Sequence, residues 1–167
     1  MKNRKPTPTA AASTTPNNAR PKRINAPRTS SGATWAPNTV TWTGNNRTHM
    51  VRVPGPGRFE LRLPDGAANP YLLQAVIIAA GLDGVRTNAN PGRRYDIDMY
   101  QMGHTVKGAP LLPLNLLDAL REYDKDKTLK AMMGEEFSAA YLKLKHKEWD
   151  SFVSHFSRWE HENTLDI

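Results

Sequence analysis

The sequence predicts an α+β fold, in which an antiparallel strand meander is followed by helices. Three segments with strand character are joined by two turn sequences, Gly44-Asn45-Asn46 and Pro54-Gly55-Pro56-Gly57. Links this short join antiparallel neighbours, whereas parallel strands usually need a longer crossover. From residue 70 onward the apolar residues recur at helical spacing. A chain of 167 residues is long enough to bury one sizeable core.

The three strand candidates are 39–43, 48–53 and 58–63. Side chains alternate between the two faces of a strand, so one face of the last candidate carries Arg58, Glu60 and Arg62. Such a row suits a site that binds anions through its arginines and holds a divalent cation through its carboxylate. The alternative is a half-exposed strand whose wet face carries solvated charges, which is the commonest antiparallel pattern.

Helices are predicted for the rest of the chain. The first begins with Asn69 as the N-cap and Pro70 as the first helical residue, and Gly84 suits its C-terminal end. A polar loop follows over residues 86–101. Further helices are expected at 114–123, at 127–133 between Asp126 and Gly134, and at 135–162. We interpret the last as a long amphipathic helix that packs on the core.

Charge is distributed unevenly along the chain. The net charge is +7, yet residues 60–167 hold thirteen basic and all sixteen acidic residues, a balance of −3. Residues 1–21 are predicted to be a disordered basic tail rich in proline and threonine, and 23–38 an ordered functional loop or flap. The tail can attract nucleic acid through counterion release, but it has no aromatic residue on which bases could stack. Specific nucleic-acid binding is therefore not expected.

Composition also bears on location and on metal sites. The absence of cysteine suits a reducing cytoplasm and excludes thiolate ligands, and no apolar run reaches membrane-spanning length. We expect a cytoplasmic protein. The five histidines lack the spacing of a zinc site, so a histidine-based metal centre is not expected. Asp96 and Asp98 could form a carboxylate pair, although loop acids are usually only solvated.

Several linked motifs resemble glutamine synthetase, over the C-terminal part of its catalytic domain. They occur in the family's order at Lys22-Arg23-Ile24-Asn25, Asn46-Arg47-Thr48, Val51-Arg52-Val53-Pro54, Glu60-Leu61-Arg62-Leu63-Pro64-Asp65 and Ala67-Ala68-Asn69-Pro70-Tyr71-Leu72. The segment Ser31-Gly32-Ala33-Thr34-Trp35-Ala36-Pro37 is most similar to the type III-like or gamma-glutamylmethylamide synthetase branch. The resemblance runs from residue 22 to residue 167.

The resemblance implies an ATP-dependent ligase that forms the γ-amide of glutamate from ammonia by way of a γ-glutamyl phosphate. By similarity, Arg23 and Arg62 hold the carboxylates of glutamate, and Arg47 is the catalytic residue on the transferring phosphate. Arg52 and Arg58 are implied to contact the ATP phosphates, and Glu60 to bind Mg²⁺ or Mn²⁺. The arginine fork suits both carboxylate and phosphate, in agreement with these roles. The family also implies a homo-oligomer.

The chain departs from the family pattern in three respects. No acid lies near Thr34-Trp35, where the family's flap glutamate is expected, and the lysine expected before Arg58 is missing. The N-terminal domain and the first metal-ligating glutamates have no counterpart in the 167 residues. We therefore expect an incomplete fragment with no measurable turnover of its own. The alternatives are a synthetase that uses methylamine, and an inactive fragment that only associates with an intact synthetase.

Overall fold

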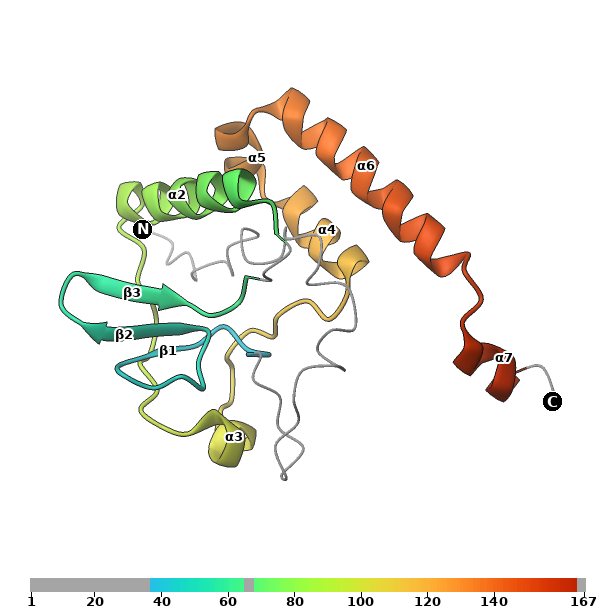
Figure 1. Ribbon diagram of the computed structural model, residues 1–167. Coiled ribbons are helices and arrows are strands. Elements are labelled where there is room, and N and C mark those ends of the chain that lie inside the picture. The colour runs from blue at the N-terminus through green and yellow to red at the C-terminus, as the bar shows by residue number, and fades with distance from the viewer. Residues whose placement is uncertain (1–36, 65–67, 165–167) are drawn as a thin grey trace.

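The computed structural model describes residues 37–64 and 68–164, and its mixed architecture confirms the α+β prediction (Figure 1). The sheet comes first, with β1 (Trp42–Thr43), β2 (Val51–Gly55) and β3 (Arg58–Leu61) in the order β1-β2-β3. The helical elements follow as α2 (Pro70–Arg86), α3 (Met99–Met102), the 3₁₀ helix η2 (Gly103–Thr105), α4 (Leu116–Lys125), α5 (Lys127–Met133), α6 (Glu135–Val153) and α7 (Arg158–Thr164).

The sheet follows the predicted meander only in its second half. β2 and β3 pair antiparallel through a hairpin turn in which Gly57 adopts a φ of 70°. β1 and β2 pair in parallel, so the antiparallel prediction is wrong for this pair. The reason is that residues 44–50 form a wide loop whose side chains bond to residues 97–99 instead of closing a tight turn. Residue Thr39, which was expected in the first strand, makes only an isolated bridge to Leu111.

Two small apolar clusters hold the described chain together. The first lies against the sheet and contains Met50, Leu63 and Leu112. The second joins α2 to the helices that follow it, through Val76, Ala79, Tyr123 and Leu129. Burial of apolar surface in these clusters supplies the main favourable term for folding. Among the described elements, the strands pack mainly on each other and α2 packs on α5. The charged strands and the helices are therefore connected mainly by the loops between them.

The start of α2 agrees with the prediction and its end does not. The side chain of Asn69 accepts hydrogen bonds from the backbone N–H groups of Tyr71 and Leu72, which is the expected N-cap. The helix continues two residues past Gly84, to Arg86. A glycine costs about 1 kcal/mol inside a helix, which the surrounding turns can offset. The chain reverses later, where Asn88 adopts a left-handed φ of 48°.

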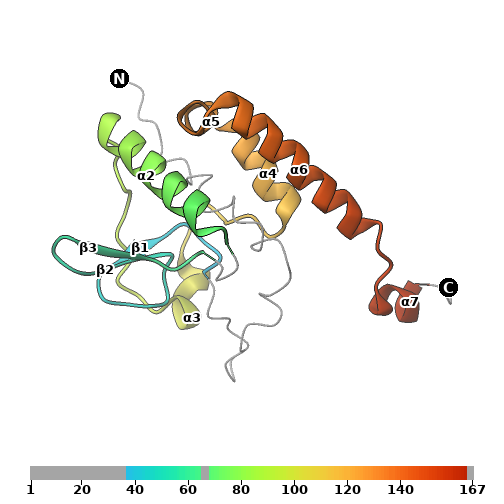
Figure 2. The same cartoon turned by 45° about the horizontal axis from the view of Figure 1, so that its top comes forward.

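The C-terminal helices combine a confirmed prediction with a wrong one. The bounds of α5 match the predicted helix, and Asp126 caps it by accepting from the Leu129 N–H at 2.9 Å. The helix predicted over 135–162 is broken between α6 and α7. Only the first half of α6 packs on the core, through Tyr141 and its neighbours, and the remainder extends away from it (Figures 1 and 2). The prediction of one long core-packed helix is therefore wrong.

Within the described ranges, no helix is both long and apolar enough to cross a membrane.

Candidate functional site

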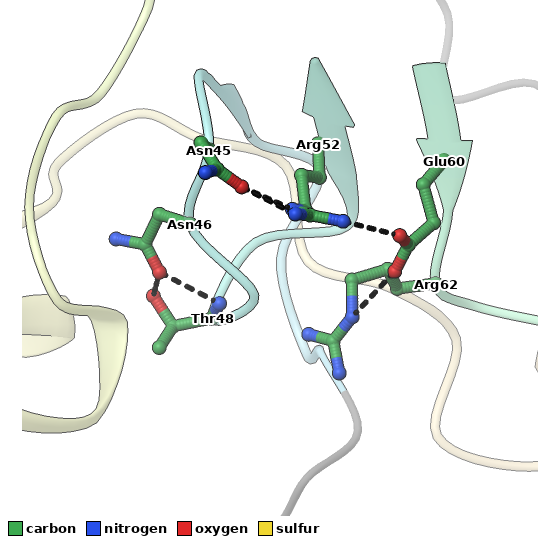
Figure 3. Close-up of polar contacts among 6 residues, drawn as sticks. All are labelled: Asn45, Asn46, Thr48, Arg52, Glu60 and Arg62. Carbon is green, nitrogen blue, oxygen red and sulfur yellow. Dashed lines mark hydrogen bonds and ion pairs between the residues drawn. The ribbon is translucent and has the colours of Figure 1, made fainter. Parts of the chain in front are cut away.

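The row of charges predicted for β3 exists, and it is joined by an arginine from β2. Glu60 lies between Arg52 and Arg62 (Figure 3). Nη1 of Arg52 donates to Oε2 of Glu60 at 2.6 Å, and Nε of Arg62 lies 3.5 Å from Oε1 of the same carboxylate. The antiparallel register places Arg52 directly opposite Glu60, which explains why these two side chains meet.

Both arginines of this group are largely withdrawn from solvent. The side chains of Arg52 and Arg62 are 11% and 14% exposed, whereas that of Glu60 is 35% exposed. The second end of Arg52 is held by Asn45, whose side-chain oxygen accepts from Nε at 3.0 Å and also from Nη2 (Figure 3). Arg52 is therefore clamped between an amide and a carboxylate, which fixes the direction of its guanidinium.

The electrostatics of Glu60 are governed by these neighbours. The hydrogen bond from Arg52 lowers the pKa of the Glu60 carboxyl below its ordinary value, with partial burial opposing the shift. The positive charges of Arg52, Arg47 and Arg62 lower it further. Arg47 is exposed in the loop between β1 and β2, yet its charge acts on Glu60. Glu60 is thus kept ionised within a cationic surrounding.

Arg62 carries an unused donor. Among the described residues, its Nη1 is buried and makes no hydrogen bond. A buried charged donor without an acceptor is costly, so such a group indicates the place of an absent anionic or carbonyl partner. The hydroxyl of Tyr100 in α3 lies within electrostatic range of Arg62. Burial raises the pKa of this hydroxyl, and the charge on Arg62 opposes that rise.

The loop that carries Arg47 is fixed to the segment before α3. The side chain of Asn46 accepts from the backbone N–H and hydroxyl of Thr48, both at 2.9 Å, and donates to the carbonyl of Ile97 at 2.9 Å. The hydroxyl of Thr48 in turn accepts from the Met99 N–H at 3.0 Å. These contacts hold the loop backbone in place. None of them involves the side chain of Arg47, so its guanidinium extends from an anchored backbone.

A fully buried histidine completes this anchorage. His49 is 0% exposed, with Nε2 2.9 Å from the carbonyl of Ile97 and Nδ1 3.0 Å from the hydroxyl of Thr41. The carbonyl can only accept, so Nε2 donates to Ile97, while Nδ1 and the Thr41 hydroxyl share the second hydrogen bond. Sequence reasoning missed His49 and Asn45. No local signal marks His49, because its partner Ile97 lies 48 residues away.

The sequence-predicted site residues are only partly brought together. The structure gathers Glu60 with Arg52 and Arg62, and brings Arg47 within range of their charges. Arg58 is exposed at the start of β3, opposite Gly55 in the hairpin. Arg23, the predicted tail and residues 23–36 of the predicted flap lie outside the described residues. The substrate group formed by Arg23 and Arg62 therefore stays a prediction.

The described residues suit an anion better than a self-contained metal site. Within residues 37–64 and 68–164, no three His, Asp or Glu side chains gather as metal ligands. Mg²⁺ is often bound by one or two carboxylates together with waters and substrate phosphates, so Glu60 fits a single ligand of such a site. Asp96 and Asp98 have structural partners instead. Asp96 accepts from Arg94 and from Thr43, and Asp98 caps α3.

These features define a class: an α+β unit whose adjacent strands carry a row of arginines around one carboxylate. A family model described as "Glutamine synthetase, catalytic domain" matches residues 6–164. The chain belongs to the glutamine synthetase family. The matched range begins at residue 6 and so overlaps the tail predicted over residues 1–21. The division of the chain at residue 21 stays a prediction.

Individual relatives are similar in sequence and in structure. A glutamine synthetase from Rhizobium leguminosarum bv. phaseoli is 72% identical over 160 residues, which cover 96% of this chain and 37% of that protein. A glutamate–methylamine ligase from Methyloversatilis universalis is 40% identical over 149 residues, covering 87% and 33%. A solved GmaS–ADP complex superposes with a TM-score of 0.80 at 52% identity, covering 97% of this chain and 40% of that one.

The GmaS structures agree with the branch that the sequence predicts. The chain spans little more than a third of the length of the two Rhizobium glutamine synthetases that it matches.

Proposed function

We propose that this chain supplies part of the active site of an ATP-dependent ligase that forms the γ-amide of glutamate from ammonia. The observation that carries the proposal is the group Arg52–Glu60–Arg62, in which a buried Nη1 of Arg62 has no partner among the described residues. Phosphoryl transfer depends on cations placed around oxygens that gain negative charge, and this group provides them on two paired strands.

The site residues divide into four roles in the proposed reaction. Arg62, together with Arg23, binds the carboxylates of glutamate, and Arg47 stabilises the charge on the transferring phosphate. Arg52 and Arg58 bind the phosphates of ATP. Glu60 is one ligand of a Mg²⁺ or Mn²⁺ ion, whose chemistry is to neutralise phosphate charge.

The site is proposed to require parts of the family fold that this chain does not span. Glu60 is the one acidic side chain within the described charge row, whereas a divalent ion between phosphates generally has further oxygen ligands. We therefore propose that the isolated chain has no measurable turnover. As the resemblance implies, the working assembly is a homo-oligomer, and the lack of cysteine suits the cytoplasm.

Two alternatives remain open to test. Methylamine could replace ammonia, and the 52% identity to GmaS favours this, whereas the relatives at 72% and 73% identity are glutamine synthetases. The chain could also be inactive and only associate with an intact synthetase. The single carboxylate in the charge row favours that alternative.

The test uses the isolated chain and a chimera in which residues 22–167 replace the matching part of the R. leguminosarum relative. Each protein is incubated with ATP, Mg²⁺, glutamate and either ammonia or methylamine, and both the amide product and phosphate are measured. We expect product from the chimera with ammonia and none above a blank from the isolated chain. Robust product from the isolated chain would refute the incomplete site. A chimera that is folded but inactive with both amines would refute the ligase proposal, and a preference for methylamine would select the first alternative.

A further inference from the structure

Asn45 holds the guanidinium of Arg52 from the side opposite to Glu60. Its side-chain oxygen accepts from Nε of Arg52 at 3.0 Å and also from Nη2, while Nη1 of the same group donates to Glu60 at 2.6 Å (Figure 3). An arginine has five N–H donors in a planar fork. Within the described part of the chain, these contacts use three of the five and leave one N–H on Nη1 and one on Nη2. Two N–H groups at the end of the fork match two oxygens of a phosphate.

The backbone fixes Asn45 at this position. The carbonyl of Gly44 accepts from the N–H of Asn46 at 2.9 Å, which closes a three-residue turn with Asn45 at its centre. The same carbonyl accepts from the N–H of Val53 at 3.2 Å, so the turn is tied to β2 one residue beyond Arg52. The amide of Asn45 therefore reaches Arg52 from a backbone that is bonded to the same strand.

A second loop holds the start of this turn. Asp96 accepts from the hydroxyl of Thr43 at 3.0 Å and from Nε of Arg94 at 2.8 Å. Arg94 lies directly on Gly44, since a side chain at position 44 would bring its Cβ within 2.6 Å of Nη2 of Arg94. In the parallel register Thr43 lies opposite Arg52, so these contacts hold the turn and the strand together.

An amide at position 45 leaves the arginine its charge. An amide oxygen and a carboxylate can both accept from Nε and Nη2, but a carboxylate would also cancel positive charge. The guanidinium of Arg52 already pairs with one carboxylate, that of Glu60. A second carboxylate beside it would weaken its attraction for a phosphate.

We propose that Asn45 is a positioning residue, a neutral clamp that directs the Arg52 guanidinium toward a phosphate of the nucleotide. The inference rests on the proposed role of Arg52 in binding ATP, and it adds a residue to which the proposed reaction gives no other role. Asn45 acts through Arg52 and not by contact with the reacting atoms. Its oxygen sets the direction of the arginine, and its neutrality preserves the charge.

Two substitutions separate direction from charge. Asn45→Ala removes the acceptor and leaves the charge of Arg52 unchanged. Asn45→Asp keeps an acceptor and adds a negative charge. The matched control is Asn90→Ala, at an exposed asparagine whose side chain accepts from the backbone N–H of Gly92 at 2.8 Å.

The direction of the arginine is measured in the full chain by NMR of the Arg52 Nε–H group, and the same spectra establish that each variant keeps its fold. Exchange of this N–H with water should be at least about tenfold faster in Asn45→Ala, because a hydrogen bond from a charged donor is lost. In Asn45→Asp it should be no faster than in wild type. The control should lie within about twofold of wild type. Unchanged exchange in Asn45→Ala would refute the clamp.

The consequence for the nucleotide is measured by calorimetry as the Kd for ATP, which requires no turnover. The protein is the chimera of residues 22–167 with the R. leguminosarum relative, and Arg52→Ala is measured beside the clamp variants. We expect Asn45→Ala and Asn45→Asp each to raise the Kd about tenfold, and Asn90→Ala to leave it within about twofold. A merely structural role for Asn45 would not weaken ATP binding in Asn45→Asp, where the arginine is still held.

Three results would overturn the inference alone. The first is an unchanged Kd in Asn45→Ala when Arg52→Ala raises it, and the second is a wild-type Kd in Asn45→Asp. The third is an equal loss in Asn90→Ala. An unchanged Kd in Arg52→Ala would refute the ATP role of Arg52 and the inference with it. A chimera that binds ATP in the expected pattern but forms no amide would refute the ligase proposal and leave the clamp standing.

Discussion

The buried histidine gives the sharpest test of how the site is held together. His49 joins Thr41 to the carbonyl of Ile97 and lies two residues after Arg47, in the loop between β1 and β2. Replacing it by alanine removes both hydrogen bonds and empties a fully buried position. We expect His49→Ala to loosen the loop and the segment before α3 together, while α4 and α5 stay unaffected.

The size of the effect follows from the contacts. Leaving a buried donor or acceptor without its partner costs about 1–3 kcal/mol, and this applies to the Thr41 hydroxyl, because the carbonyl of Ile97 still accepts from Asn46. Loss of a buried ring adds a cavity cost, part of which is relieved by collapse or by water. A total of about 3 kcal/mol in local opening free energy corresponds to roughly a hundredfold faster amide exchange.

Hydrogen exchange at low protein concentration measures the local opening free energy without requiring cooperative unfolding of the whole chain. The reporters are the Val51 N–H, which donates to Thr41 at 3.0 Å, and the Met99 N–H, which donates to Thr48 at 3.0 Å. The matched control is His104→Ala, at an exposed histidine in η2. Exchange within about threefold of wild type in His49→Ala, or an equal effect of His104→Ala, would refute the anchoring role.

Three further predictions concern single contacts. The pKa of Glu60 lies below its ordinary value of 4.5, so its ionised form stabilises the fold above that pH and the contribution is lost as pH falls through the lowered pKa. Acid titration should therefore destabilise wild type more than Glu60→Gln, and equal acid sensitivity would contradict this. Tyr123→Phe removes a buried 2.8 Å hydrogen bond to Ser138 and should cost about 1 kcal/mol, measured by amide exchange in α4. Adding Ser138→Ala to that variant should cost less than Ser138→Ala in the wild type, because Ser138 then loses only its 3.3 Å bond to the carbonyl of Lys130. Full additivity would argue against that bond. Asn69→Ala should cost about 1 kcal/mol at the start of α2, and Asn69→Asp should preserve the cap; equal exchange in both variants would exclude capping.

The sequence is a good guide where a structure is set by near neighbours. Asn69 followed by Pro70 starts a helix, since both the cap and the fixed φ act within one turn. Alternation in β3 placed Glu60 and Arg62 on one face because the strand period is two. The bounds of α5 were predicted because Asp126 and Gly134 act locally at its two ends.

Predictions that depended on distant contacts were less successful. The sequence 44–46 resembles a hairpin turn, but bonds from Asn46 and His49 to Ile97 open it into a wide loop and leave β1 parallel to β2. The face of this strand opposite the charge row carries Phe59, Leu61 and Leu63, yet Phe59 is 62% exposed, whereas Leu63 lies in the apolar cluster and Leu61 packs against it. Burial of that kind depends on which segments cover the sheet, and no local pattern specifies them.

The candidate site shows the same division. The members of the charge row could be identified from alternation and from the resemblance to glutamine synthetase. Their arrangement could not, because the clamp on Arg52 by Asn45 and Glu60 depends on the pairing of β2 with β3. The unpartnered Nη1 of Arg62 likewise results from burial that only the folded chain reveals.

The most direct test of the account is the amide-forming activity of the chimera after single substitutions in the charge row. Arg47→Ala and Glu60→Ala should each lower kcat/KM with ammonia at least about a hundredfold, as expected for loss of one transition-state contact. Arg121→Ala is the matched control, since Arg121 is exposed on α4 and pairs only with nearby Asp118 among the described residues, and it should retain full activity. An active chimera that is indifferent to both substitutions would show that the chemistry does not reside in this row of arginines and its carboxylate.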